Sequence, residues 1–165
     1  MDTFLAIASK RDERRYASAT IAGDVVERIL DAGRVAGSAR NRQPWRFVVV
    51  ESADRVEQLA AAVYEPDNVR GAALVVALVG QGFDLGRCAQ NMMLAAWNDG
   101  VLSCPNGIAD ADAAAAAVGL DADEQLGIVL SFGHPARPRN PEARPAADWS
   151  ARAKRNPLAE IVTRI

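Results

Sequence analysis

The loop from Gly37 to Trp45 contains small and polar residues in an order suited to binding a flat ligand. Small side chains let such a ligand approach the backbone closely. Ser38, Asn41 and Gln43 offer hydrogen-bond donors and acceptors, and Trp45 adds a large apolar surface. A planar heteroaromatic ring needs this mixture, because its faces are apolar and its edge forms hydrogen bonds. An ordinary polar loop anchored by a tryptophan has the same composition, so these residues alone do not decide between the two interpretations.

Other residues that could do chemistry are sparse. The glycine-spaced stretch 80–86 lies between a strand and a helix, but its spacing is one residue longer than that of a dinucleotide-binding loop. A tight turn is the favoured interpretation. His134 is the only histidine, and its place before a proline favours a turn residue over a nucleophile's partner. Cys88 and Cys104 make neither a disulfide framework nor a metal set. We therefore expect no metal site and assign no catalytic side chain.

The elements that must position the loop follow from hydrophobic periodicity and capping residues. Helices are expected over 1–9, 23–36, 52–64, 84–98 and 109–118. The helix over 109–118 is nearly all alanine and aspartate, which predicts an exposed helix that Gly119 ends. Buried strands are expected over 46–51, 73–79, 101–104 and 125–132. This pattern predicts an α/β or α+β fold with one small sheet and flanking helices.

Composition limits the classes of function. The chain has 165 residues, the size of one domain, and a formal net charge of −2, which gives no general attraction to nucleic acid or anionic lipid. The longest apolar run, 72–79, is too short to span a bilayer. The N-terminal residues lack the order of a signal peptide, since their apolar stretch precedes the basic residues. We expect a cytoplasmic protein of one domain, 1–165.

A stretch rich in proline and arginine, about 135–157, lies near the C-terminal end of this domain. Its composition opposes a regular element and predicts an extended arm. Trp149 and the apolar residues beyond the arm favour burial. We therefore interpret the stretch as an arm that lies on a partner subunit, with a mobile tail as the alternative.

The loop and its surroundings resemble a known family. The order Gly-Ser-x-x-Asn-x-Gln-Pro-Trp-x-Phe after an amphipathic helix resembles the motif of the nitroreductase family, flavoenzymes that bind FMN at a homodimer interface. That family usually has proline at the position of Gly37. Four further segments resemble the family in the same order, so the resemblance spans nearly the whole chain: 9–16, 84–96, 102–107 and 155–162.

The resemblance implies a set of cofactor-binding residues. Arg11 and Arg15 would hold the FMN phosphate, a role that guanidinium groups suit because they bind phosphate with two hydrogen bonds. Glu13 stands where the family commonly has serine, and a carboxylate beside a phosphate is unfavourable unless it turns away or pairs with a neighbouring arginine. Arg155 would be the last basic contact. The other implied contacts are the turn at Pro105, Asn106 and Gly107, whose amides would face flavin N5, and the loop residues Gly37, Ser38, Ala39, Asn41 and Gln43.

The resemblance also implies a fold and a reaction. The fold would be α+β, with a central mixed or antiparallel sheet flanked by helices, in a homodimer that exchanges arms. Electrons would pass from NAD(P)H through flavin N5 to a nitro compound, quinone or enone. The loop would then face the flavin that the other subunit's arginines hold. Two alternatives remain: a protein that binds flavin or the deazaflavin F420 with little or no NAD(P)H turnover, and a dimeric domain that has lost its cofactor.

Overall fold

The computed structural model describes all residues from 1 to 165, which form two compact units. The core unit contains residues Arg11–Pro138. The terminal unit combines the two ends of the chain, Met1–Lys10 and Arg139–Ile165. No helix in either unit is both long and apolar enough to cross a lipid bilayer.

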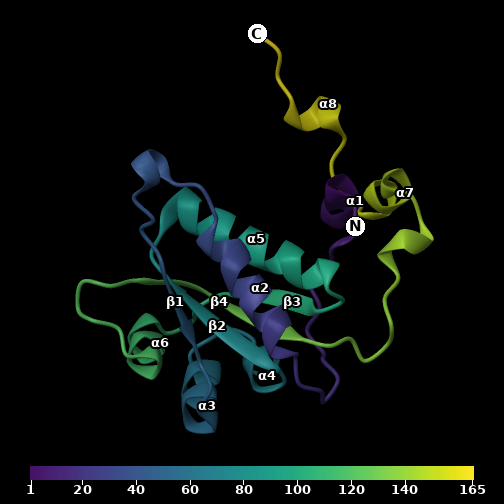
Figure 1. Ribbon diagram of the computed structural model, residues 1–165. Helices are drawn as coiled ribbons and strands as arrows, with labels where there is room; N and C mark the ends of the chain where they lie inside the picture. The colour runs from purple at the N-terminus through teal and green to yellow at the C-terminus, as the bar shows by residue number, and fades with distance from the viewer. The chain divides into compact units, whose positions relative to one another are not determined.

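A four-stranded antiparallel sheet with the order β1-β2-β4-β3 forms the centre of the core unit (Figure 1). Its strands are β1 (Arg46–Val49), β2 (Leu74–Val79), β3 (Leu102–Asn106) and β4 (Leu126–Gly133). Every residue of β2 is buried, because this central strand has packed layers on both faces. The register places Val76 opposite Val49 on one side and opposite Leu130 on the other.

Two layers of helices cover the sheet. On one face, α2 (Gly23–Arg34) and α5 (Gly82–Asn98) lie side by side and share a core with Leu78 and Phe132 (Figure 1). Gly33 allows their close approach, since a Cβ atom there would collide with the side chain of Met92. The alternate strand residues Val75 and Val129 belong to a second core on the opposite face. This second core lies under α3 (Ala53–Ala61), α4 (Pro66–Arg70) and α6 (Ala111–Val118).

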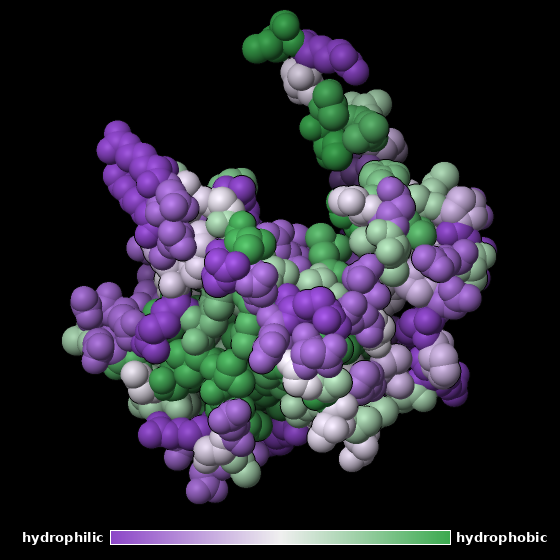
Figure 2. All heavy atoms as spheres, viewed as in Figure 1, coloured by the Kyte–Doolittle hydropathy of each residue, from purple (hydrophilic) through white to green (hydrophobic).

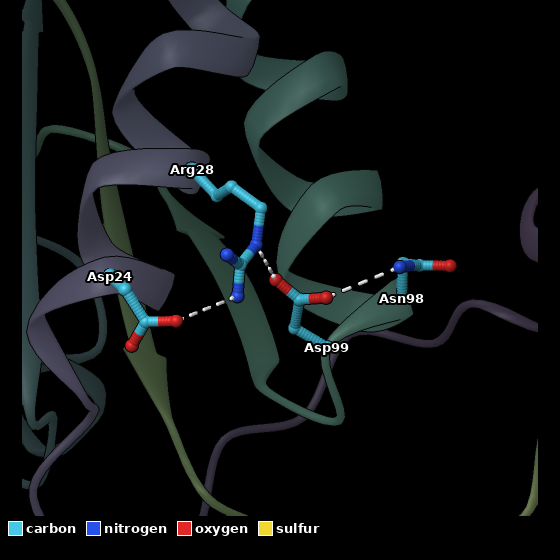
Figure 3. Close-up of polar contacts among 4 residues, drawn as sticks. All are labelled: Asp24, Arg28, Asn98 and Asp99. Atoms are coloured by element: carbon cyan, nitrogen blue, oxygen red, sulfur yellow. Dashed lines mark hydrogen bonds and ion pairs between the residues drawn. The ribbon is translucent and has the colours of Figure 1, made fainter.

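A charged bridge joins the ends of α2 and α5 at the surface (Figure 3). The guanidinium group of Arg28 donates to Asp99 at 2.7 Å and to Asp24, one turn earlier on its own helix, at 3.3 Å. The same Asp99 accepts a hydrogen bond from the side chain of Asn98 at 3.2 Å. These carboxylates raise the pKa of Arg28 further above its ordinary value. The bridge is exposed, so it adds little stability and mainly fixes how the two helix ends meet.

The terminal unit contains short helices from both ends of the chain. They are α1 (Thr3–Ser9), a 3₁₀ turn at Pro141–Ala143, α7 (Ala146–Arg152) and α8 (Leu158–Ile161). Asp2 caps α1 by accepting from the amide of Leu5 at 3.0 Å. The indole of Trp149 donates to the carbonyl oxygen of Pro141 at 2.8 Å, and Arg144 lies over the Trp149 ring. These contacts tie α7 to the proline-rich turn before it.

The α+β class and the antiparallel sheet are confirmed, with four corrections to the predicted elements. The stretch about 135–157 is not wholly extended, because Pro145 immediately precedes α7, where the missing N–H of proline costs nothing. The helix ended by Gly119 (φ 66°) is exposed on one side only, since its alanines 114 and 117 are buried against the second core. Helix α5 begins at Gly82, before the predicted cap Asp84, and α4 was not predicted.

Candidate functional site

The Gly37–Trp45 loop has a tightly wound backbone. Three residues that are not glycine take left-handed conformations: Arg40 and Asn41 with φ of 54°, and Gln43 with φ of 50°. Such a conformation costs roughly 1–2 kcal/mol for each residue, so surrounding contacts must hold it. One of these contacts is internal: the Ser38 hydroxyl accepts from the amide of Gln43 at 2.8 Å. Backbone strain of this kind is concentrated at functional sites in proteins.

The first turns of α5 hold the same loop from outside. Arg87 donates to the carbonyl oxygen of Gly37 at 2.6 Å, and Asp84 accepts from the amide of Ala39 at 3.4 Å. A Cβ atom on Gly37 would lie 2.6 Å from Nη2 of Arg87. The guanidinium group therefore occupies the space beside residue 37, which explains why glycine suits this position where the family pattern usually has proline.

Apolar packing anchors the other end of the loop. Trp45 is half-buried and packs against the core beneath α2 and α5. Apolar side chains gather over β1, green in Figure 2. A cavity of about 440 Å³ at this surface is lined in part by Leu30, Trp45 and Phe47. The polar residues of the loop, Asn41 and Gln43, remain exposed.

The basic segment Arg11–Arg15 is attached to the outer edge of β3. Asp12 forms a parallel bridge with Ser103, and the amide of Glu13 donates to the Ser103 carbonyl oxygen at 3.2 Å. The segment is therefore not a free solvated turn, although a solvated turn is the usual form of such charged runs. Arg11 is half-buried and Arg15 is exposed.

Tyr16 fixes the end of this basic segment. Its hydroxyl group lies 3.1 Å from the carbonyl oxygen of Ser131, to which it donates, and 3.0 Å from the Ser131 hydroxyl. Its ring lies so close to Gly133 that a Cβ atom there would be 2.5 Å from Cγ of Tyr16. Burial raises the pKa of Tyr16 far above its ordinary value, so the phenol stays neutral.

The segment Pro105–Gly107 was predicted as a turn, but Pro105 and Asn106 are the last residues of β3, paired with Leu130 and Val129, and only Gly107 lies beyond the strand. This segment, called the turn below, rests on a buried network of amides. The Asn106 side chain is 3% exposed, and its Nδ2 lies within hydrogen-bond distance of three acceptors. These are the Cys104 carbonyl oxygen at 3.1 Å, the Val129 carbonyl oxygen at 3.2 Å and the Ser131 hydroxyl at 3.0 Å. The Asn106 Oδ1 accepts from Asn68 Nδ2 at 3.0 Å. The side chain of Asn106 is thus used internally and is not free to bind a ligand.

The core unit places the basic segment and the turn on one strand, β3, and the Gly37–Trp45 loop elsewhere. The basic segment meets β3 at Ser103, and the turn ends at Gly107, four residues or about 13 Å along the same strand. The Gly37–Trp45 loop lies beyond β1, at the opposite edge of the sheet, three strand spacings or about 14 Å away. The core unit therefore holds the loop and the turn at opposite edges of the sheet. Arg155 belongs to the terminal unit, where it is exposed.

Sequence reasoning missed the residues that support these groups. Nothing in the spacing of Asn68, Ser131 or Arg87 marks them, because each acts on a segment far away in the chain. No group of three or more His, Cys, Asp or Glu side chains lies close enough together to hold a metal ion. The hydroxyl of Ser103 is buried and has no hydrogen-bond partner.

Comparisons with known proteins agree with this arrangement. The model of the nitroreductase family matches residues 7–81 and 75–134. A protein of Methanothermobacter thermautotrophicus named as an NADH dehydrogenase/NAD(P)H nitroreductase is 32% identical over 59 residues, 36% of this chain and 31% of that protein. A similar protein of Archaeoglobus fulgidus is 36% identical over 56 residues. The matched part thus spans about a third of each curated relative.

Solved structures extend the similarity to nearly the full length. A structure described as a nitroreductase in complex with FMN, from Desulfovibrio desulfuricans, has a TM-score of 0.82 and 28% identity, and the match covers 100% of this chain and 98% of that one. Nitroreductase A from Vibrio parahaemolyticus shares the fold, with a TM-score of 0.83 and 24% identity over 99% of this chain and 75% of its own. The family model covers well over half of the sequence, and this chain belongs to the nitroreductase family.

Proposed function

We propose that this protein is an FMN-dependent oxidoreductase that passes electrons from NAD(P)H to an electron-poor small molecule. The observation that carries the proposal is the pair of groups on β3: the basic segment Arg11–Arg15 bridges Ser103, and Gly107 at the far end of the turn lies four residues or about 13 Å further along. That separation is the scale of a ribityl phosphate joined to a ring system. Membership in the family and the FMN complex of the Desulfovibrio desulfuricans relative support the same cofactor.

The residues present fit FMN at both ends. The backbone hydrogen bond from Glu13 to Ser103 holds the basic segment in place, so Arg11 and Arg15 can bind a phosphate without first ordering the chain. At the other end, Gly107 is exposed and has no side chain of its own, and the ring of Tyr64 lies against it on one side. The turn is rigid, because the amide network fixes Asn106. Backbone amides aimed at a flavin edge would stabilise added electron density there.

A homodimer would complete the site. The Gly37–Trp45 loop lies at the sheet edge opposite β3, and we propose that a second copy supplies this loop to the flavin bound near β3. The terminal unit supports association, since α8 and the residues after it expose apolar side chains that favour burial, visible in green in Figure 2: Leu158, Ile161, Val162 and Ile165. We propose two FMN sites for each dimer, with Arg155 as a further basic contact.

The protein's part in the reaction would be to bind, orient and exclude water. When bound, FMN would supply the redox chemistry, accepting electrons from NAD(P)H and passing them on to the electron-poor acceptor. The arginines would fix the phosphate, and Asn41 and Gln43 from the second copy would offer donors and acceptors. Cys104 beside the turn is buried, and we assign no side chain as a general acid.

Anaerobic reduction tests this proposal directly. The purified protein is loaded with FMN, and the flavin absorbance is followed after addition of NADH or NADPH. We expect bleaching by one of the two donors and return of the colour when a quinone is added. Persistent colour with both donors would contradict the enzyme and leave a protein that only binds flavin. A titration of the cofactor-free protein with F420, compared with one with FMN, tests the deazaflavin alternative. Tighter binding of F420 than of FMN would make F420 the assigned cofactor.

Arginine variants test the phosphate end. Arg11→Ala and Arg15→Ala should each weaken FMN binding by about 10-fold or more, because each removes a charge-assisted hydrogen bond worth roughly 1.5–3 kcal/mol. Arg34→Ala is the matched control, since Arg34 is exposed on α2 and pairs with Asp31. Equal FMN affinity in the three variants would refute the assignment of Arg11 and Arg15.

A further inference from the structure

The hydroxyl group of Ser131, on strand β4, lies between Tyr16 and Asn106. It is fully buried, 3.0 Å from the Tyr16 hydroxyl group, and Nδ2 of Asn106 donates to it at 3.0 Å, the shortest of the three contacts of that nitrogen. The Tyr16 hydroxyl also donates to the Ser131 carbonyl oxygen at 3.1 Å. These three side chains, called the buried link below, form a continuous hydrogen-bonded path from the end of the basic segment to the turn.

Further contacts hold both ends of the buried link. At one end, Tyr16 forms an antiparallel bridge with Pro135, which fixes the backbone where the basic segment ends. At the other end, Oδ1 of Asn106 accepts from Nδ2 of Asn68 at 3.0 Å, which attaches the turn to α4. Ser131 is therefore the joint between two segments that are each fixed in the core unit.

Stability of the fold alone does not require a polar path at this place. Burial of polar groups costs free energy that their hydrogen bonds only offset, and apolar side chains of the same shape can pack about as well. Hydrogen bonds differ from apolar contacts in their narrow range of lengths and angles. The buried link therefore supplies a defined spacing between the basic segment and the turn.

We propose that Tyr16 and Ser131 are positioning residues that set the distance between the two ends of the FMN site. This inference rests on the proposed function, because it takes the basic segment as the phosphate end and the turn as the ring end. FMN meets both ends at once, so its affinity depends on how well their spacing matches the ligand. Riboflavin, which lacks the phosphate, meets only the turn and does not depend on that match.

Titration of the cofactor-free protein with FMN and with riboflavin, followed by flavin fluorescence, tests the inference. Tyr16→Phe removes the hydroxyl group but keeps the ring against Gly133, and Ser131→Ala removes the joint. Each variant should weaken FMN binding by about 3- to 10-fold, the range of one hydrogen bond, and change riboflavin binding by less than about 2-fold. Ser18→Ala is the matched control, since Ser18 is an exposed serine close to the basic segment.

The midpoint potential of the bound flavin separates a positioning role from a structural one. With a mismatched spacing, the FMN ring would settle less well on the turn, whose backbone amides would stabilise the reduced form. The potential of bound FMN should therefore become more negative in Tyr16→Phe and Ser131→Ala, whereas that of bound riboflavin should stay at the wild-type value. A loss of stability alone, measured by urea denaturation, would leave both potentials unchanged.

The double variant shows whether the two residues act through one link. Tyr16→Phe combined with Ser131→Ala should lose less binding free energy for FMN than the sum of the two single losses. Additive losses would overturn the inference, as would unchanged FMN affinity in both single variants, an equal loss for riboflavin, or an unchanged FMN potential. Failure of the wild type to bind FMN would instead overturn the proposed function, and that result precedes any substitution.

Discussion

Replacing Asn106 with aspartate would change the buried network while nearly preserving its shape. The Oδ1 atom could still accept from Asn68, but the donor at the Nδ2 position would become an oxygen facing the carbonyl oxygens of Cys104 and Val129. The two N–H donors of Nδ2 would be lost, and each hydrogen bond is worth roughly 1 kcal/mol. Burial of an unpaired charge adds to this cost. We expect Asn106→Asp to lower the free energy of unfolding by at least about 3 kcal/mol at pH 7.

The loss of stability in Asn106→Asp should depend on pH, and the direction of that dependence can be predicted. Burial and the facing carbonyl oxygens should raise the pKa of the new carboxyl group above its unfolded value of about 3.9. A raised carboxyl pKa lowers stability as the pH rises through the interval between the unfolded and folded values. The deficit of the variant should therefore shrink as the pH falls from 7 towards 4, where a protonated carboxyl group donates again.

Urea denaturation followed by far-ultraviolet circular dichroism measures both effects. Asn156→Asp is the matched control, because Asn156 is exposed and should tolerate the same change. A loss below about 1 kcal/mol at pH 7 would refute the network as a buried, satisfied unit. A deficit that grows towards pH 4 would refute the assigned direction of the hydrogen bonds.

Three other substitutions or reactions test separate parts of the structure. Gly37→Ala and Arg87→Ala should each lower the free energy of unfolding, measured by urea denaturation, by about 1 kcal/mol. The double variant should lose less than the sum of the two, because removal of the guanidinium group makes room for the new Cβ atom. Additive losses would contradict this contact. Burial raises the pKa of Cys88 to about 11, so iodoacetamide at pH 8 should modify it about 100-fold more slowly in native protein than in urea, as mass spectrometry would detect. Trp149→Phe removes the donor to Pro141 and should speed proteolysis of the terminal unit, whereas unchanged cleavage would count against that hydrogen bond.

Local sequence signals predicted the sheet well. The continuous apolar runs of β2 and β4 are typical of strands buried on both faces, and both were placed within one residue at each end. Gly119 ended α6 as expected, because a left-handed residue without a Cβ atom costs little there. The exposure of α6 was predicted for the whole helix but holds for one face only, since alanine packs against a core as readily as it faces water.

The supporting contacts of the candidate site could not be predicted in the same way. Asn68 and Asn106 meet only because α4 and β3 are folded together, and no periodic pattern connects them. The side chain of Arg87 reaches a carbonyl group fifty residues earlier. Composition also misled at Pro145, where prolines were taken to oppose a helix although one of them precedes its first turn. Motifs therefore located the loop, whereas the segment predicted as a turn is mostly the end of β3, and tertiary packing decided what holds both.

The most direct test of the central claim is a titration of cofactor-free protein with FMN, followed by FMN fluorescence. We predict quenching that saturates at about one FMN for each chain, with a molecular mass by light scattering that corresponds to two chains. Asn41→Ala, in the loop expected from the second copy, should weaken binding as Arg11→Ala does. Unquenched FMN at high micromolar protein would contradict flavin binding, and tight binding by a monomer would contradict the shared site.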